Sequence, residues 1–260
     1  MPEGPAPAPA VQRLRLRYAK RGRLRFSSTR DFQRALERAL RRADVPMAFS
    51  AGFHPHPKIS YANAAPTGTA SEAEYVELSV TERVDPAAVC AALDEALPPG
   101  LDVLQVVEVR APAPGQPAPP SLADRLQASD WVIAFREVGV PALAEAAHTL
   151  LAQERAEVTR TFKTGPRTFD VRSAIVRLDA ASSDTVAGDV PWVVPVGMGT
   201  CAILRVVVRH TTPAVRPDDV LTALRAVADL DPPTPPLVTR LAQGPLQDAT
   251  AAVADPLAND

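Results

Sequence analysis

Two histidines, an aromatic ring and a lysine lie close together in residues 52–58, where prolines alternate with them. Glycine permits a sharp turn and the prolines stiffen the chain, so we expect an exposed loop with a preorganised tip. Such a tip suits stacking on an unpaired RNA base with a cation near a phosphate. An equally weighted alternative is structural, with the aromatic ring filling the core. The candidate residues are Gly52, Phe53, His54, His56 and Lys58.

Metal and cofactor chemistry has little support in the sequence. His54 and His56 could both ligate a metal, but no further ligands follow at a suitable spacing, so we expect no metal site and no cofactor. Cys90 and Cys201 each lie in an apolar periodic segment, which indicates buried thiols rather than cluster ligands. Phosphate-binding glycine loops, nucleophile elbows and zinc-protease motifs are absent from the sequence. An enzymatic role is therefore uncertain, and a non-catalytic role is favoured.

Basic residues are concentrated near the start of the chain. Residues 11–42 hold 12 of the 28 lysines and arginines and 2 of the 30 acids, a net +10, which leaves −12 elsewhere. Arginines alternate with apolar residues at the start of this segment and predict strands with five guanidinium groups on one sheet face. A further stripe, Arg30, Arg34, Arg38 and Arg41, follows a predicted helix. These surfaces could bind RNA or an acidic partner, or merely protect a strand from aggregation. The candidates are Arg13, Arg15, Arg17, Lys20, Arg21, Arg23 and Arg25.

A second group of candidates lies in the later half of the chain. Residues 163–167 read as a turn that carries Lys163 and Arg167, and the following strand places Asp170 and Arg172 on one face. Together they could grip a polar group. As a structural alternative, Asp170 and Arg172 form an ordinary surface ion pair that contributes little.

The elements that must position these residues follow the same order twice. Residues 11–110 read as strand, helix, two strands, helix and strand, and residues 129–242 read similarly. This order predicts an α+β fold of two tandem ferredoxin-like halves with antiparallel sheets. We expect residues 1–10 to form a disordered leader, residues 111–128 a proline-rich linker, and residues 243–260 a disordered tail.

Several stretches resemble the radical-SAM-linked domain family of unknown function. The resemblance is carried by residues 17–26, by the helix at 35–42, by Phe49–Ser60, and more weakly by residues 163–172. In that family the domain is fused behind a radical SAM module or forms a separate protein, often encoded near an E/G-type ribonuclease and ribosomal-protein genes. We expect the separate form here, so the resemblance implies a radical SAM protein as partner and RNA or a ribosomal substrate as ligand.

These observations favour a non-catalytic RNA- or substrate-binding module that serves a separate radical SAM partner. Two alternatives remain open: a protein adaptor that touches no nucleic acid, and a metal-independent RNA-modifying or RNA-cleaving enzyme that uses Asp170 or a loop histidine. No apolar run approaches a membrane span and no apolar segment follows Met1, so we expect a cytoplasmic protein without membrane contact.

Overall fold

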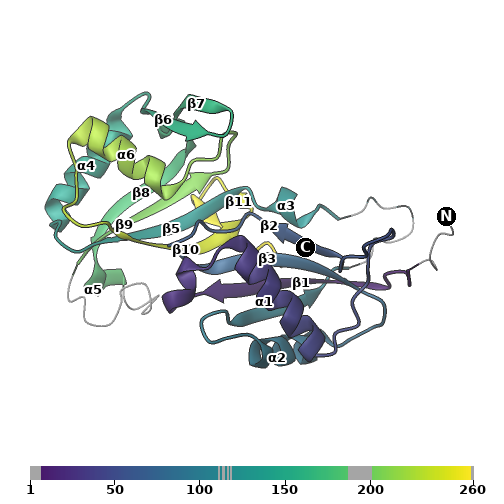
Figure 1. Cartoon of the computed structure of the whole chain (residues 1–260). Helices are drawn as coiled ribbons and strands as arrows, with labels where there is room; N and C mark the ends of the chain where they lie inside the picture. Colours follow the sequence, from purple (N-terminus) through teal and green to yellow (C-terminus); the bar gives the residue numbers. More distant parts are fainter. Residues whose placement is uncertain are drawn as a thin grey trace. The chain divides into compact units, whose positions relative to one another are not determined.

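The computed structural model describes residues 7–110, 112, 115, 117, 119–186 and 201–258. These residues fall into two compact units (Figure 1). Unit 1 comprises residues 1–125 and 256–260, and unit 2 comprises residues 126–255. Most of the predicted leader lies outside the described residues, as do residues 111, 113, 114, 116 and 118 of the predicted linker.

Unit 1 is an antiparallel sheet covered on one face by two helices (Figure 1). Its strands pair in the order β4-β1-β3-β2, and the 3₁₀ helix η1 follows β1. Apolar side chains of β1 and β3, including Leu14, Leu16 and Leu78, pack against Phe32 and Leu36 of α1. The elements are β1 Gln12–Lys20, η1 Gly22–Phe26, α1 Thr29–Arg42, β2 Ile59–Ala62, β3 Ala70–Val80, α2 Pro86–Ala96, β4 Val103–Glu108 and α3 Leu122–Arg125.

Local sequence signals explain where α1 begins and ends. Ser28 is the N-cap, and it forms a reciprocal capping box with Asp31, which satisfies backbone donors of the first turn. Phe32, Leu36, Ala39 and Leu40 then recur at helical spacing and are buried. The helix ends before Asp44, whose φ of 48° is left-handed.

The strand predicted at Arg23–Phe26 is wrong, because these residues form η1. Gly22 adopts a φ of +52°, which turns the chain away from β1 directly after Lys20. In the 3₁₀ helix Leu24 packs against the core, whereas Phe26 is 67% exposed. Phe26 is therefore not part of the core, and Arg23 and Arg25 do not extend the arginine row of β1.

Unit 2 is also an antiparallel sheet with helices packed on one face, and its strands pair in the order β10-β5-β9-β8. A separate hairpin, β6–β7, stands apart from this sheet. The strand predicted to carry both Asp170 and Arg172 is interrupted, because β7 ends at Asp170, η2 contains Arg172, and β8 follows. The elements are β5 Ala128–Phe135, α4 Val140–Ala152, β6 Glu157–Phe162, β7 Gly165–Asp170, η2 Arg172–Ala174, β8 Ile175–Ser182, α5 Ser183–Val186, β9 Ala202–Arg209, α6 Pro217–Ala228, β10 Leu237–Gly244, β11 Leu246–Gln247 and β12 Ala252–Val253. The α+β class is confirmed.

The predicted disordered tail has regular structure in its described part. Strand β10 continues to Gly244, and Leu246 and Gln247 then pair with Ala252 and Val253 in a short hairpin. Beyond the hairpin Leu257 is 3% exposed. The disorder predicted from residue 243 is therefore wrong up to residue 258. Within the described ranges, no helix is long and apolar enough to cross a membrane.

Candidate functional site

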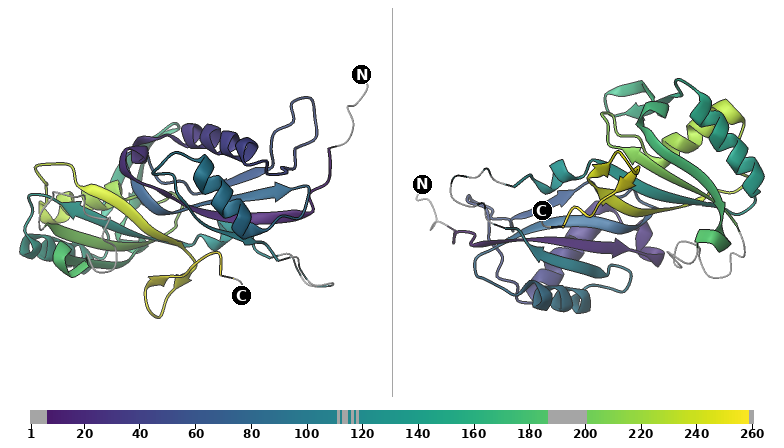
Figure 2. Two further views of the ribbon diagram at one scale, coloured as in Figure 1. Left: turned by 90° about the horizontal axis from the view of Figure 1, so that it is seen from below. Right: turned by 180° about the vertical axis from the view of Figure 1, so that it is seen from behind.

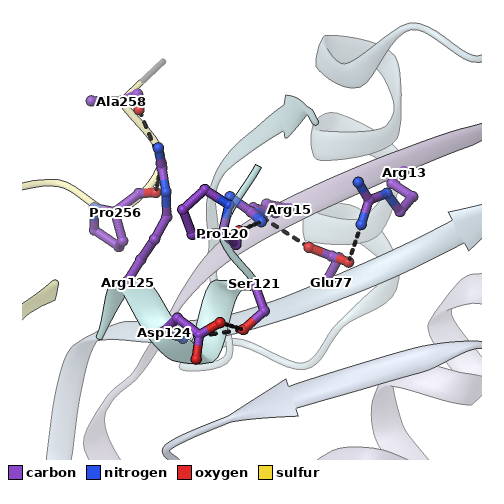
Figure 3. Close-up of polar contacts among 9 residues, drawn as sticks. All are labelled: Arg13, Arg15, Glu77, Pro120, Ser121, Asp124, Arg125, Pro256 and Ala258. Atoms are coloured by element: carbon purple, nitrogen blue, oxygen red, sulfur yellow. Dashed lines mark hydrogen bonds and ion pairs between the residues drawn. The ribbon is translucent and has the colours of Figure 1, made fainter. Parts of the chain in front are cut away.

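The arginines of β1 are largely engaged within unit 1 instead of forming a free cationic face (Figure 3). Arg15 is 4% exposed; its Nε donates to Glu77 Oε2 at 2.9 Å and its Nη2 donates to the carbonyl of Pro120, also at 2.9 Å. Arg13 donates to the other oxygen of Glu77 at 3.4 Å. Register explains the pairing, because Arg15 lies directly opposite Glu77 on β3. The expectation of five guanidinium groups on one open face is wrong.

Arg17 completes this row. It lies opposite Tyr75 and is half-buried, and its Nε atom has no hydrogen-bond partner among the described residues. The backbone at 120–121 crosses the same face of the sheet, held by Arg15 (Figure 3). This face of β1 is therefore a packing surface within unit 1.

Lys20, Arg21 and Arg25 hold loops at one end of the sheet. Lys20 is 5% exposed and donates to the carbonyls of Ala65 and Pro66 at 3.3 and 3.2 Å. Arg21 binds Glu72 and Asp102, and the hydrogen bonds that it donates to the Glu72 carboxylate raise the pKa of its guanidinium. Arg25 donates to the carbonyl of Gly68 at 2.8 Å, and its burial lowers its pKa. These residues stabilise the fold, and of the η1 arginines only Arg23 is exposed.

The exposed basic surface of unit 1 is instead the outer face of α1. Four arginines at spacings of three and four residues lie on one side of this helix and are exposed, and none forms an ion pair with a described residue: Arg30, Arg34, Arg38 and Arg41. We call these four residues the α1 arginine stripe. The sequence predicts this stripe, but its four arginines were not among the candidate binding residues. The signal was its helical spacing opposite the buried Phe32 and Leu36.

The 49–58 loop is exposed, and its backbone is held in a hairpin-like shape. Phe49 bridges to Pro57, the amide of Ser50 donates to the carbonyl of His56 at 2.8 Å, and the amide of His56 donates to Ser50 Oγ at 3.0 Å. Gly52 adopts a φ of +122°, which glycine tolerates best. The left view of Figure 2 shows this dark-blue loop standing out from the sheet of unit 1 on the side of α1.

At the tip of this loop Phe53 is 79% exposed, and His54, His56 and Lys58 are exposed as well. The alternative in which Phe53 fills the core is therefore wrong. An aromatic ring with basic neighbours on a constrained backbone is available for stacking or for docking to a partner.

A small pocket that is open to solvent lies at the start of α1. Tyr18 and Phe32 stack at 4.0 Å between ring centroids, and Tyr61 meets Phe32 edge-on. The Tyr61 hydroxyl is buried without a hydrogen-bond partner in the described part of the chain; burial and the nearby Glu37 raise its pKa to about 12. Because Asp31 already places a carboxylate at this helix start, the pocket does not favour an anion. The residues that line this pocket are scattered along the sequence, so no local sequence pattern predicts it.

Asp170 and Arg172 do not pair with each other. Asp170 accepts hydrogen bonds from the amides of Ala156, Arg172 and Ser173 at 2.9, 3.0 and 3.3 Å. Burial raises the pKa of Asp170, but these hydrogen bonds lower it by more, so the pKa lies below its usual value. Arg172 donates to the carbonyl of Leu151 at 3.1 Å. Both residues close the base of the β6–β7 hairpin, whereas Lys163 and Arg167 are exposed at its tip.

Residues 13–217 match a family described as "Uncharacterized protein conserved in bacteria (DUF2344)". This chain belongs to the DUF2344 family. The matched DUF2344 region begins at Arg13 in β1 and ends at Pro217, the first residue of α6, so it contains the α1 arginine stripe, the 49–58 loop and the β6–β7 hairpin. No curated protein matches the sequence.

The described part of this DUF2344 protein holds no group of three or more histidine, cysteine or acidic side chains that could bind a metal ion. Burial raises the pKa of the Cys90 thiol, which donates weakly to the carbonyl of Val103 at 3.7 Å. Cys201 is buried. The Cys90 thiol therefore lacks the lowered pKa that a nucleophile requires.

Proposed function

We propose that this DUF2344 protein is a non-catalytic accessory module that binds RNA, or an RNA-containing ribosomal substrate, for a separate radical SAM protein in the cytoplasm. One observation carries the proposal. The α1 arginine stripe is exposed and forms no ion pair with a described residue, and the same unit presents Phe53, 79% exposed, beside two histidines and a lysine. Arginines contact phosphates, and an exposed ring on a constrained loop stacks on a base.

We infer further that each unit is a ferredoxin-like module. The strand orders β4-β1-β3-β2 and β10-β5-β9-β8, antiparallel and joined through two helices each, support this inference. Ferredoxin-like sheets often serve as RNA platforms through aromatic residues on the open face. In unit 1 that face carries Arg13, Arg15 and Glu77, and the 120–121 backbone crosses it, so the helix face and the loop are the better RNA surface.

The test is recovery of RNA and proteins from one crosslinked sample of the tagged, full-length protein in its own cells. We expect a defined RNA, and the radical SAM protein, to be enriched with the wild type. The double variant Arg34→Glu/Arg38→Glu should lose the RNA. A matched control, Arg209→Glu/Arg225→Glu, makes the same charge change at two exposed arginines of unit 2 and should retain it. Equal RNA enrichment from all three proteins would contradict the role of the α1 arginine stripe, and recovery from the wild type at background level would contradict RNA binding.

A second candidate function is a protein adaptor without nucleic-acid contact. It is favoured by Phe53 itself, because one exposed aromatic ring among cations also resembles the anchor of a protein interface. In that case the radical SAM protein would be recovered with background RNA only. A metal-independent enzyme has less support, since three backbone amides already occupy the carboxylate of Asp170.

A further inference from the structure

The β6–β7 hairpin interrupts the element order that the two units otherwise share. In unit 1 the chain passes from α1 to β2 without an intervening strand, whereas in unit 2 the hairpin lies between α4 and β8. It forms a two-stranded sheet of its own and adds no strand to the main sheet of unit 2. Figure 1 shows it beside α6. The main sheet of unit 2 is complete without the hairpin, although Val158 and Phe169 on its inward face pack against the core of unit 2.

The base of the hairpin is fixed to the rest of unit 2. The carboxylate of Asp170 holds the amide of Ala156, and the amide of Val171 donates to the Ala156 carbonyl at 2.8 Å. Further along β6, Arg160 pairs with Asp219 of α6 and donates to the carbonyl of Ala214 at 3.0 Å. Val158 is 4% exposed. These contacts make the hairpin a rigid arm.

The tip of the hairpin is basic and rich in hydroxyls. Lys163 and Arg167 are exposed, and neither forms an ion pair with a described residue. The guanidinium carbon of Arg167 lies 5.5 Å from the centroid of the Phe162 ring, and its Nη2 donates to Thr164 Oγ1 at 3.1 Å, so its position is set in advance. The two acidic residues of the hairpin, Glu157 and Asp170, lie opposite each other on β6 and β7 at the other end of the hairpin.

We propose that the tip of the β6–β7 hairpin is a second RNA contact, in which Lys163 and Arg167 bind phosphate groups and the exposed threonine hydroxyls donate to phosphate oxygens. This inference rests on the proposed function. In this proposal unit 2 binds the RNA backbone whatever the base sequence, while the Phe53 loop of unit 1 contacts bases.

The exposed side chains of the hairpin favour RNA over a protein partner. Its outward face and tip consist of Thr159, Thr161, Thr164, Pro166 and Thr168, with no large apolar side chain. Protein interfaces depend on apolar and aromatic anchors, whereas phosphate contacts need only cations, hydroxyls and amides. The nearest aromatic ring, Phe162, is half-buried beneath the guanidinium groups of Arg160 and Arg167.

The test is the salt dependence of affinity for a fluorescent oligouridylate of about 20 nucleotides, measured by anisotropy with the full-length protein. The logarithm of affinity falls with the logarithm of salt by about 0.7 for each phosphate contacted on a single strand. Lys163→Ala/Arg167→Ala should therefore lower the magnitude of the slope by about 1.4. The matched control Arg209→Ala/Arg225→Ala, at two exposed arginines elsewhere in unit 2, should leave the slope unchanged.

The two proposals fail in different ways. If the wild type binds RNA and Arg34→Ala/Arg38→Ala lowers the slope while the hairpin variant matches the wild type, the hairpin inference is overturned and the proposed function stands. If the wild type does not bind RNA, both are overturned. If the hairpin variant keeps the RNA affinity and salt slope of the wild type but no longer recovers the radical SAM protein from the crosslinked sample, the hairpin is a protein contact and the RNA assignment is wrong. Unchanged circular dichroism and thermal midpoint establish that the hairpin variant is folded.

Discussion

Arg15 of β1 lies directly opposite Glu77 of β3 and binds its carboxylate at 2.9 Å, in a part of unit 1 where the arginine is 4% exposed. The alternating arginines of β1 therefore contribute in part to hydrogen bonds within unit 1. Arg15 also binds the backbone carbonyl of Pro120, whereas the α1 arginine stripe remains exposed.

Removing Glu77 leaves the buried guanidinium of Arg15 without its anion. We expect Glu77→Ala to lower the free energy of unfolding by about 2–4 kcal/mol, because an unpaired buried charge is costly. A matched control is the exposed pair of Arg83 and Glu108, whose side chains are 76% and 39% exposed. There Glu108→Ala should cost at most about 1 kcal/mol. Urea unfolding measures both, and similar small losses would show that the Arg15 pair adds little.

Phe53→Ala should weaken RNA binding without changing stability. A stacked base contributes about 1–3 kcal/mol, so affinity should fall roughly 5- to 150-fold while the salt slope stays the same, because no cation is removed. The control is Phe26→Ala, since Phe26 is 67% exposed in η1 of the same unit. An equal loss of affinity in both variants would mean that general surface hydrophobicity, and not stacking at the loop, controls binding.

Protonation of His210 should destabilise unit 2. Burial lowers the pKa of this imidazole, the hydrogen bond with the Leu126 carbonyl opposes the shift, and the charge of Arg240 adds to it. The folded pKa lies below the unfolded value of about 6.5, so the unfolded state binds the proton first as pH falls. Stability is therefore full above about pH 6.5 and declines below it. In thermal unfolding from about pH 8 to pH 5, His210→Gln should flatten this decline; an unchanged profile would assign the decline to other groups.

Asp170→Ala should separate a structural role from a catalytic one. Three backbone amides lose their acceptor, so we expect the free energy of unfolding to fall by about 1–2 kcal/mol. Affinity for RNA should stay near that of the wild type at temperatures where the variant is folded. Loss of an RNA-modifying activity in a fully stable Asp170→Asn variant would instead favour the enzymatic alternative.

Tyr61→Phe removes a buried hydroxyl that has no partner among the described residues. Because a desolvated, unpaired hydroxyl is unfavourable, the variant should be as stable as the wild type or more stable by up to about 1 kcal/mol. Ultraviolet titration should also lose a tyrosine that ionises near pH 12. A clear loss of stability would indicate that the hydroxyl has an unrecognised partner.

Periodicity predicted most elements of this fold but not the partners of their polar residues. The capping box at Ser28 and the apolar spacing from Phe32 to Leu40 placed α1 correctly. The left-handed φ of Gly22 ends the extended backbone after β1, although arginine and apolar residues continue to alternate in the sequence. The residue types alone do not show this turn. The role of Arg15 depended on Glu77, 62 residues away, so exposure could not be inferred from alternation alone. The structure of the tail was missed because its hairpin strands, β11 and β12, are only two residues long and are too short to show a periodic pattern.

Arg125 donates to the carbonyls of Pro256 and Ala258, at 2.6 and 3.1 Å, so residues that precede and follow unit 2 in the sequence are joined within unit 1 (Figure 3). Unit 2 is thus an insertion in the sequence of unit 1. During synthesis, residues 1–125 leave the ribosome long before their last partners exist. Pro256 and Ala258 are synthesised after all of unit 2, so unit 1 gains these contacts of Arg125 only when unit 2 has already been made.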